Sequence, residues 1–173
     1  MAIQVKAIYP PKMRPDLYKQ AMIAELGRQS DQVLRLYLAT TRTWKRQPKF
    51  RVDFKYGNEP VREGGGAAFA VMTDDEIFHY VDQGTKGPYP IPRVARPGKR
   101  LAFRTKYRAK TRRRVLGSGA GGSSGDLVRP TQVMHPGIKA RQFTQEIQKR
   151  RRAPFFRAMK EAHLKGLRLA KRG

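Results

Sequence analysis

Hydrophobic residues recur at helical spacing near the start of the chain and predict a long helix there. An Arg-Pro-Asp sequence at 14–16 suits a helix start, because proline fits the first turn and an acid favours the positive end of the helix dipole. From there to about Thr43, the recurring positions are Met22, Leu26, Val33, Tyr37 and Trp44. Gly27 weakens the middle of this helix. We expect residues 1–14 to form an extended arm ahead of it.

Two strands and a short helix are predicted next. Aromatic and aliphatic residues alternate strictly with polar ones over 50–56, which is the pattern of a half-buried strand. Residues 67–73 predict a second strand, and the turn at 57–60 with the three glycines at 64–66 predicts a hairpin with a long loop. The acids at 74–76 indicate a helix start, and Gly84 indicates its end.

Residues 99–134 predict a long basic hairpin loop rich in glycine and serine. A stiff proline-rich connector at 88–92 leads to a strand marked by Leu101 and Phe103, and residues 127–134 supply the returning strand. The sequence Gly-Ser-Gly-Ala-Gly-Gly-Ser-Ser-Gly at 117–125 has the composition of a flexible loop. We therefore expect a mobile tip.

A second long helix is predicted at the C-terminal end. Phe143 and Ile147 have helical spacing, and Pro154 is expected to kink or restart the helix, which continues through Phe156 and Leu167. The two terminal helices should frame a small, mostly antiparallel sheet. The predicted fold is a single α+β domain over residues 1–173.

Positive charge is concentrated in the second half of the chain and points to an acidic partner. The formal net charge is +25, and residues 99–173 hold 22 of the 38 Lys and Arg residues but only 3 of the 13 acids. So asymmetric a field favours a polyanionic or strongly acidic neighbour. Nucleic acid, or an acidic protein surface, is the first partner class to consider.

Two basic segments are the candidate contacts for DNA or an acidic partner. The hairpin supplies Arg104, Lys106, Arg108, Lys110, Arg112, Arg113 and Arg114, with Phe103 and Tyr107 between them. A second run consists of Lys149, Arg150, Arg151 and Arg152. Either set could neutralise phosphates, and an aromatic residue could stack on bases. Alternatively, each segment is a solvated surface, and aromatic residues that alternate along a strand are usually core.

Sequence signals for catalysis, metal binding or membrane insertion are weak. The chain has no cysteine, and its three histidines are far apart, so a thiolate or histidine metal site is not indicated. Asp74, Asp75 and Glu76, with Asp82, are the one concentrated acidic cluster, and helix capping explains them better than Mg²⁺ binding. We expect no enzyme activity, no metal and no cofactor. The N-terminal residues lack a signal-peptide core, and no segment approaches the ~20 apolar residues of a membrane span. We thus expect a soluble protein made in a cytoplasm, with no membrane partner.

Two stretches of the sequence resemble one family of phage proteins. The first is Tyr-Val-Asp-Gln-Gly-Thr at 80–85, followed by the proline-rich loop and the strand at 101–103. The second is Val-Met-His-Pro-Gly-Ile-Lys-Ala-Arg-Gln-Phe at 133–143, which leads into the last helix. Together they resemble the small neck and tail-completion proteins of long-tailed bacteriophages, including the family of lambda minor tail protein Z. The likeness spans about residues 74–170, and residues 104–125 depart from it. The family positions matched here are Gly84, Thr85, His135, Pro136, Gly137 and Phe143.

These positions make physical sense as elements of a fold. Gly84 can adopt a left-handed conformation that ends a helix, which other residues resist. Pro136 and Gly137 can redirect the returning strand into the last helix. Phe143 can anchor that helix to the sheet.

The resemblance implies a structural role in the virion. It implies a homo-oligomeric ring, a hexamer, at the head–tail junction, in contact with head-closure or connector proteins and with tail-terminator or tail-tube proteins. Closing such a ring requires a heterologous interface. The basic hairpin would contact packaged DNA, acidic faces of neighbouring proteins, or both. Assembly would take place in the host cytoplasm. The alternative, from charge alone, is a free-standing nucleic-acid-binding protein associated with the ribosome or nucleoid.

Overall fold

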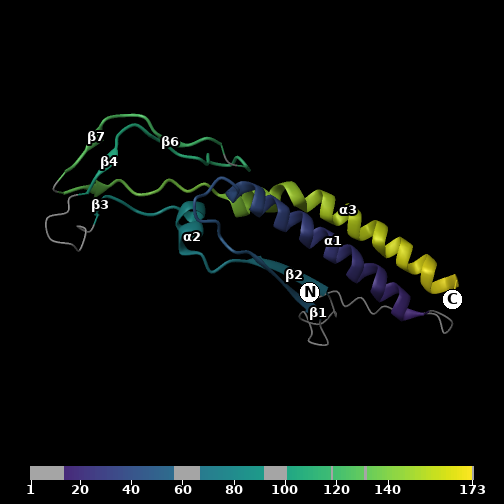
Figure 1. The fold of residues 1–173 in the computed structure, drawn as a ribbon. Helices are drawn as coiled ribbons and strands as arrows, with labels where there is room; N and C mark the ends of the chain where they lie inside the picture. The colour runs from purple at the N-terminus through teal and green to yellow at the C-terminus, as the bar shows by residue number, and fades with distance from the viewer. Residues whose placement is uncertain (1–13, 57–66, 92–100, 118, 131, 173) are drawn as a thin grey trace, which may run out of the picture. The chain divides into compact units, whose positions relative to one another are not determined.

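The computed structural model describes residues 14–56, 67–91, 101–117, 119–130 and 132–172 (Figure 1). The expected N-terminal arm, apart from Arg14, and the loop at 57–66 lie outside these residues. The chain forms two compact units. Unit 1 comprises Met1–Arg35, Phe50–Thr73 and Gln148–Gly173, and unit 2 comprises Leu36–Lys49 and Asp74–Ile147.

Two long helices run through both units and match the sequence prediction. The first, α1, is Pro15–Thr41, and the last, α3, is Phe143–Arg172. Pro154 lies inside α3, which continues through it instead of restarting after it. Of the two predicted outcomes, a kink or a restart, the restart was therefore wrong. Packing on either side of the proline explains the continuity, because Arg151 and Phe155 both contact other elements of unit 1.

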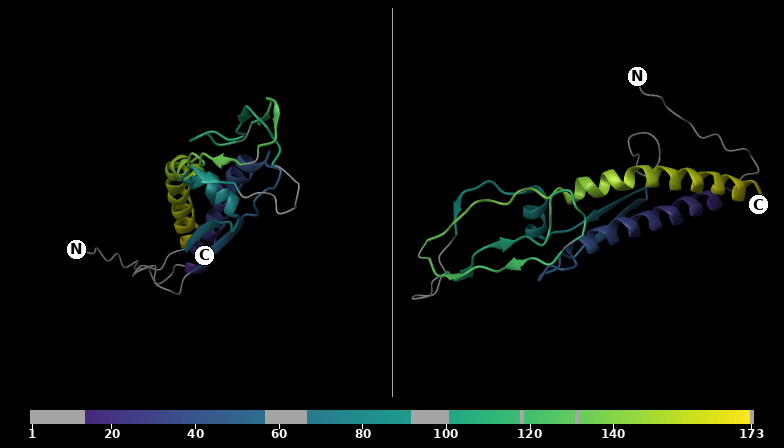
Figure 2. Two further views of the ribbon diagram at one scale, coloured as in Figure 1. Left: turned by 90° about the vertical axis from the view of Figure 1, so that its left-hand side faces the viewer. Right: turned by 90° about the horizontal axis from the view of Figure 1, so that it is seen from above.

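Within unit 1, α1 and α3 lie side by side and antiparallel (Figure 2). The Arg14 amide donates to the carbonyl of Ala170 (3.1 Å), and the Tyr18 hydroxyl is 2.8 Å from Nδ1 of His163. Gly166 permits this close approach, since a Cβ there would lie 2.9 Å from Cδ2 of Tyr18. His163 therefore has a packing and hydrogen-bonding role between the two helices.

The predicted strands at 50–56 and 67–73 are also confirmed in unit 1. Strand β1, Arg51–Tyr56, pairs antiparallel with β2, Ala67–Met72, with Phe54 opposite Phe69. The Phe69 ring packs against Phe155 of α3, with ring centroids 6.2 Å apart. An aromatic cluster thus fastens this hairpin to α3.

Unit 2 is built around the short helix α2, Glu76–Gln83. The Asp75 side chain caps its start by accepting from the Phe78 amide (2.8 Å), and Gly84 ends it, so both predicted boundaries are confirmed. Phe78 is 3% exposed and contacts the rings of Tyr37, Trp44 and Phe143. Phe143 therefore anchors α3 to α2, and the expectation that it packs on a sheet was wrong.

The remaining strands of unit 2 form short antiparallel pairs. Strand β3 (Tyr89–Pro90) pairs with β8 (Met134–His135), β4 (Phe103–Arg104) with β7 (Leu127–Val128), and β5 (Tyr107–Arg108) with β6 (Gly122–Ser123). The fold is α+β, as predicted, but the described strands make four separate two-stranded sheets and no single one. Prolines and glycines beside these two-residue strands limit their extension. In the part of the chain that the structure describes, no helix is long and apolar enough to cross a membrane.

Candidate polyanion-binding surface

The predicted basic hairpin exists and is a narrow two-stranded ribbon within unit 2. Between the β4–β7 and β5–β6 pairs, the amide of Thr105 donates to the carbonyl of Asp126 (3.0 Å), and that of Gly125 donates to Thr105 (3.1 Å). Lys106 has a φ of 54° at the point where the two pairs meet. We call residues 103–108 and 122–128 the basic ribbon. Beyond the basic ribbon, the two strands of the hairpin are still joined where the Gly119 amide donates to the Lys110 carbonyl (2.8 Å).

Glycines in the returning strand hold the two strands at close range. A Cβ on Gly121 would lie 2.8 Å from both the Arg108 carbonyl oxygen and the Lys110 amide nitrogen. A Cβ on Gly125 would lie 2.9 Å from the carbonyl carbon of Thr105. Within the glycine-rich sequence expected to be a loop, Gly122 and Ser123 therefore form a strand that pairs closely with β5.

The tip of the hairpin is hydrogen-bonded to residues of unit 2 at the end of α1, just after it, and just before α3. Lys110 Nζ donates to the Thr43 carbonyl (2.6 Å), and the Gly117 amide lies 3.4 Å from the hydroxyl of the fully buried Thr40. The Arg114 amide donates to the Arg141 carbonyl (2.8 Å), and its Nε donates to Gln142 Oε1 (3.1 Å). In place of the expected mobile tip, the structure has one fastened by Lys110 and Arg114.

The other predicted bases of the hairpin are presented to solvent. These are Arg104, Lys106, Arg108, Arg112 and Arg113, and Arg129 adds a further exposed base that the sequence analysis did not single out. Among the described residues, none of these six forms an ion pair, and Arg104 Nη1 lies 3.5 Å from the Gly125 carbonyl oxygen. Phe103 is 41% exposed and Tyr107 is 73% exposed, so neither is a core residue of the ribbon. Strands β4, β5 and β6 are exposed at both of their positions.

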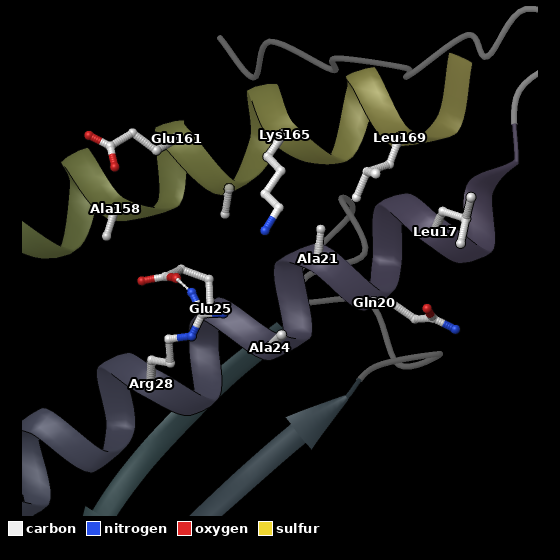
Figure 3. A pocket seen from close by; sticks show the side chains of 11 residues that line it. Leu17, Gln20, Ala21, Ala24, Glu25, Arg28, Ala158, Glu161, Lys165 and Leu169 are labelled. Atoms are coloured by element: carbon white, nitrogen blue, oxygen red, sulfur yellow. Dashed lines mark hydrogen bonds and ion pairs between the residues drawn. The ribbon is translucent and has the colours of Figure 1, made fainter. Parts of the chain in front are cut away.

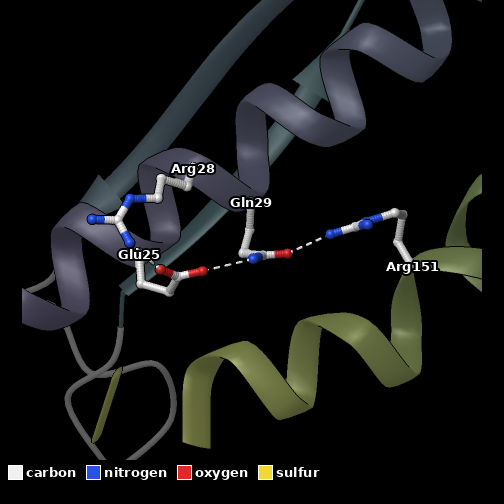
Figure 4. A network of polar contacts seen from close by, with 4 residues as sticks. All are labelled: Glu25, Arg28, Gln29 and Arg151. Atoms are coloured by element: carbon white, nitrogen blue, oxygen red, sulfur yellow. Dashed lines mark hydrogen bonds and ion pairs between the residues drawn. The ribbon is translucent and has the colours of Figure 1, made fainter. Parts of the chain in front are cut away.

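The second basic run lies on α3 in unit 1 and contains one residue with an internal role. Arg151 donates to Gln29 Oε1 (2.6 Å) and to Gln32 Oε1, and Gln29 is 4% exposed. Gln29 in turn donates to Glu25, which also pairs with Arg28 (Figure 4). Lys149, Arg150 and Arg152 are exposed. Arg151 therefore links α3 to α1 and is not presented to a partner.

The two stretches that carry the family resemblance meet at one junction in unit 2. Thr85 and Ile138 exchange backbone hydrogen bonds (2.9 and 3.3 Å), and the Ile138 amide also donates to the Thr85 hydroxyl (2.9 Å). Gly84 has φ 82° and ψ 168°, and a Cβ there would lie 2.7 Å from the Ile138 carbonyl oxygen. Its φ is positive as expected, but its ψ places it in a region open only to glycine and outside the left-handed helical one.

The His-Pro-Gly turn completes this junction. Nδ1 of His135 accepts from the Gly137 amide (3.0 Å), and its ring stacks on Tyr89 at 4.9 Å. Gly137 has a φ of 86°, and a Cβ there would lie 2.6 Å from the Thr85 carbonyl oxygen. His135 therefore closes the turn, and Pro136 and Gly137 lead the chain toward α3.

Asp82 also belongs to the junction and contacts the start of α3, a role that the sequence did not indicate. It is 9% exposed, its Oδ1 accepts from the Thr144 amide (3.2 Å), and its carbonyl accepts from the Gln142 amide (2.9 Å). Asp82 thus caps the start of α3, where a carboxylate also favours the helix dipole. Burial, together with the charge of Asp82, raises the pKa of the neighbouring Tyr37 hydroxyl, and a hydrogen bond with Thr144 partly opposes this shift.

A pocket of about 350 Å³ lies between α1 and α3 in unit 1 (Figure 3). Small residues line its floor, including Ala21, Ala24, Ala158 and Ala162, and Glu161 and Lys165 stand on α3 beside it. Its lining includes the Glu25–Arg28 ion pair but no histidine and no serine. Within the described ranges, no group of three or more His, Cys, Asp or Glu residues could hold a metal ion.

The chain matches no protein-family model, no curated protein and no solved structure.

Proposed function

We propose that this chain is a structural protein of the head–tail junction of a long-tailed bacteriophage. In this role, copies of the chain form a ring that joins the tail to the head and lets DNA pass. The observation that supports the proposal best is the junction between residues 84–85 and 135–138. The two stretches that resemble neck and tail-completion proteins are about 50 residues apart in sequence, yet they bond to each other through Thr85 and Ile138.

This pairing supports the resemblance because five of the six matched positions have a physical task within unit 2, beginning with Thr85. Gly84 and Gly137 make room for the opposite backbone, His135 closes the turn, and Phe143 is fully buried against α2. A chance likeness of two short stretches would not require them to interlock. The partners in this proposal are other copies of the chain, the connector or head-closure protein, and the tail terminator or tail tube.

Cryo-electron microscopy of the virions tests the proposal. We expect a ring at the head–tail junction into which α1, α2 and α3 can be built, with the chain identified there by mass spectrometry of the particles. A phage carrying Gly84→Ala should yield unjoined heads and tails, whereas the matched control Gly27→Ala, at a helical glycine with open space around it, should assemble normally. Intact virions that lack the chain would contradict the proposal.

A second candidate function is a free-standing nucleic-acid-binding protein, which the six exposed bases of the hairpin favour, since none of them forms an ion pair within the described residues. This candidate requires binding of nucleic acid by a monomer and no incorporation into virions. Sedimentation of the purified chain, with and without virion proteins, distinguishes this candidate from the proposed function, because the first predicts a monomer and the second a ring.

A further inference from the structure

We propose that the basic ribbon binds B-form duplex DNA, with the ribbon lying in the major groove. This inference adds a partner to the surface described above and goes beyond the proposed function, since a ring could form without it. It rests on the geometry of unit 2 alone. Lys110 and Arg114 position the ribbon through their hydrogen bonds to the rest of unit 2. Arg104, Lys106 and Arg108 contact phosphates.

The charge of the ribbon fits a phosphate backbone. Arg104, Lys106 and Arg108 are exposed, pair with no acid in the described part of the chain, and follow one another at every second residue. Asp126 is the one acid in the sequence from 101 to 130. Arginine and lysine side chains supply most phosphate contacts in protein–DNA complexes.

The shape of the ribbon favours a groove over a flat acidic protein face. Two strands lie only ~4.8 Å apart, and the major groove of B-form DNA, ~12 Å wide, admits a two-stranded ribbon. The returning strand adds little width, because residues 122–125 are Gly-Ser-Ser-Gly. The exposed strand positions on both faces could contact two groove walls, whereas a flat partner would cover one face.

The same shape disfavours duplex RNA as the partner. The major groove of A-form RNA is deep and narrow, so an element as wide as two strands cannot enter it. Contact would then be limited to the outer phosphates. Discrimination between the two duplexes is therefore a direct consequence of the proposed geometry.

The fastened tip prepares the ribbon for binding. A two-stranded hairpin is marginally stable by itself, but here Lys110, Gly117 and Arg114 tie its tip to the Thr43 carbonyl, the Thr40 hydroxyl and Gln142. Little conformational entropy is then lost when the partner binds. Ser123 and Ser124 are exposed on the returning strand of the ribbon, and their hydroxyl groups can donate to phosphates.

Fluorescence anisotropy with the purified full-length chain tests the partner class. The probes are a short mixed-sequence DNA duplex, the same sequence as duplex RNA, and polyglutamate as an acidic polypeptide. At physiological salt we expect DNA to bind at least about tenfold more tightly than either alternative. Equal or tighter binding of polyglutamate would assign the ribbon to an acidic protein, and equal binding of RNA would exclude insertion into the major groove.

Two triple variants with the same change in charge test the location. Arg104→Gln/Lys106→Gln/Arg108→Gln should lower the slope of log K against log salt by about 2.7, because each phosphate contact contributes ~0.9. The control Lys149→Gln/Arg152→Gln/Arg157→Gln changes exposed bases of α3 and should lower it by less than about 1. Equal losses in both variants would overturn the proposal.

Methylation of guanine N7 by dimethyl sulfate tests the groove on the wild-type complex, so it does not depend on any variant folding. N7 lies in the major groove, and we expect it to be protected. Protection of adenine N3 in the minor groove, with N7 still reactive, would overturn the proposal. Ring assembly measured in the same samples separates the two hypotheses: a ring that fails to bind DNA would defeat this inference and leave the proposed function standing.

Discussion

The hairpin and the basic run at 149–152 look alike in sequence but differ in how the fold uses their charges. In the hairpin, Lys110 and Arg114 fasten the tip, while five other predicted bases remain exposed on a narrow ribbon and its tip. In the helical run, Arg151 turns toward Gln29 and Gln32 of α1, and its three neighbours are exposed on one regular helix. Each region therefore contains both structural and presented cations.

The comparison shows that a basic run does not by itself define a binding site. A cation that donates to a carbonyl or a buried amide stabilises the protein, and its removal should appear first in unfolding experiments. A cation without a described partner should instead affect binding of a polyanion and its salt dependence. Substitution of single residues can separate these two classes in both regions.

Arg151→Ala should have the largest effect on stability. The change leaves the Oε1 atom of the buried Gln29 without its charged donor, which typically costs about 3 kcal/mol of unfolding free energy. Urea unfolding followed by circular dichroism measures the loss. The adjacent Arg152→Ala is the control and should change stability by less than about 0.5 kcal/mol. Equal effects of the two substitutions would mean that Arg151 contributes no more to stability than the exposed Arg152.

Gly121→Ala should disrupt the hairpin at a cost of about 2 kcal/mol, because a Cβ has to enter space held by the backbone of Arg108 and Lys110. Gly119→Ala is the matched control, since the nearest atom to its Cβ would be the Lys110 carbonyl oxygen at 4.0 Å. Amide exchange of the basic ribbon should accelerate in the first variant only. Unchanged exchange in Gly121→Ala would mean that the strands are not closely paired.

Lys110→Ala should release the tip while leaving the rest of unit 2 folded. The lost contact with the Thr43 carbonyl is partly exposed, so we expect a cost of about 1 kcal/mol. Exchange of the Gly117 and Gly119 amides should increase, and DNA affinity should fall more than for a residue that only loses its charge. Arg112→Ala removes the same charge from an exposed position and should leave amide exchange unaltered. Faster exchange in that control would argue against a specific fastener.

Tyr37→Phe should have the smallest effect, which is a change in how the stability of unit 2 depends on alkaline pH. Burial, with the charge of Asp82, raises the pKa of Tyr37 above its unfolded value of about 10. The folded state therefore favours the protonated hydroxyl, and the associated stability, complete below pH ~10, is lost as the pH rises through the raised pKa. In Tyr37→Phe, stability should fall less steeply over this range. A variant with the same pH slope as the wild type would exclude this contribution.

Local sequence signals predicted the helices and the longer strands well. Asp75 and Gly84 mark the ends of α2 because capping depends on residues next to the helix. The alternation over 50–56 is long enough to define β1. By contrast, strands of two residues have no periodicity to detect, so the separate pairs of unit 2 could not be distinguished from one sheet.

Long-range contacts account for what sequence reasoning missed at the candidate site. Lys110 meets Thr43 across 67 positions, and nothing near either residue indicates the contact. Arg151 gave a usable signal, since it lies four residues from both Ile147 and Phe155 and so shares the apolar face of α3. Asp82 was grouped with the acids at 74–76, although its place before Gly84 and Thr85 set it within the junction motif.

Hydrogen exchange measured by mass spectrometry, with and without a DNA duplex, tests whether DNA binds the basic ribbon and not the helical run. We expect DNA to slow exchange in peptides covering the basic ribbon, at residues 103–108 and 122–128, and to leave peptides covering 149–157 unchanged. Protection of the helical run with an unaffected ribbon would contradict this expectation.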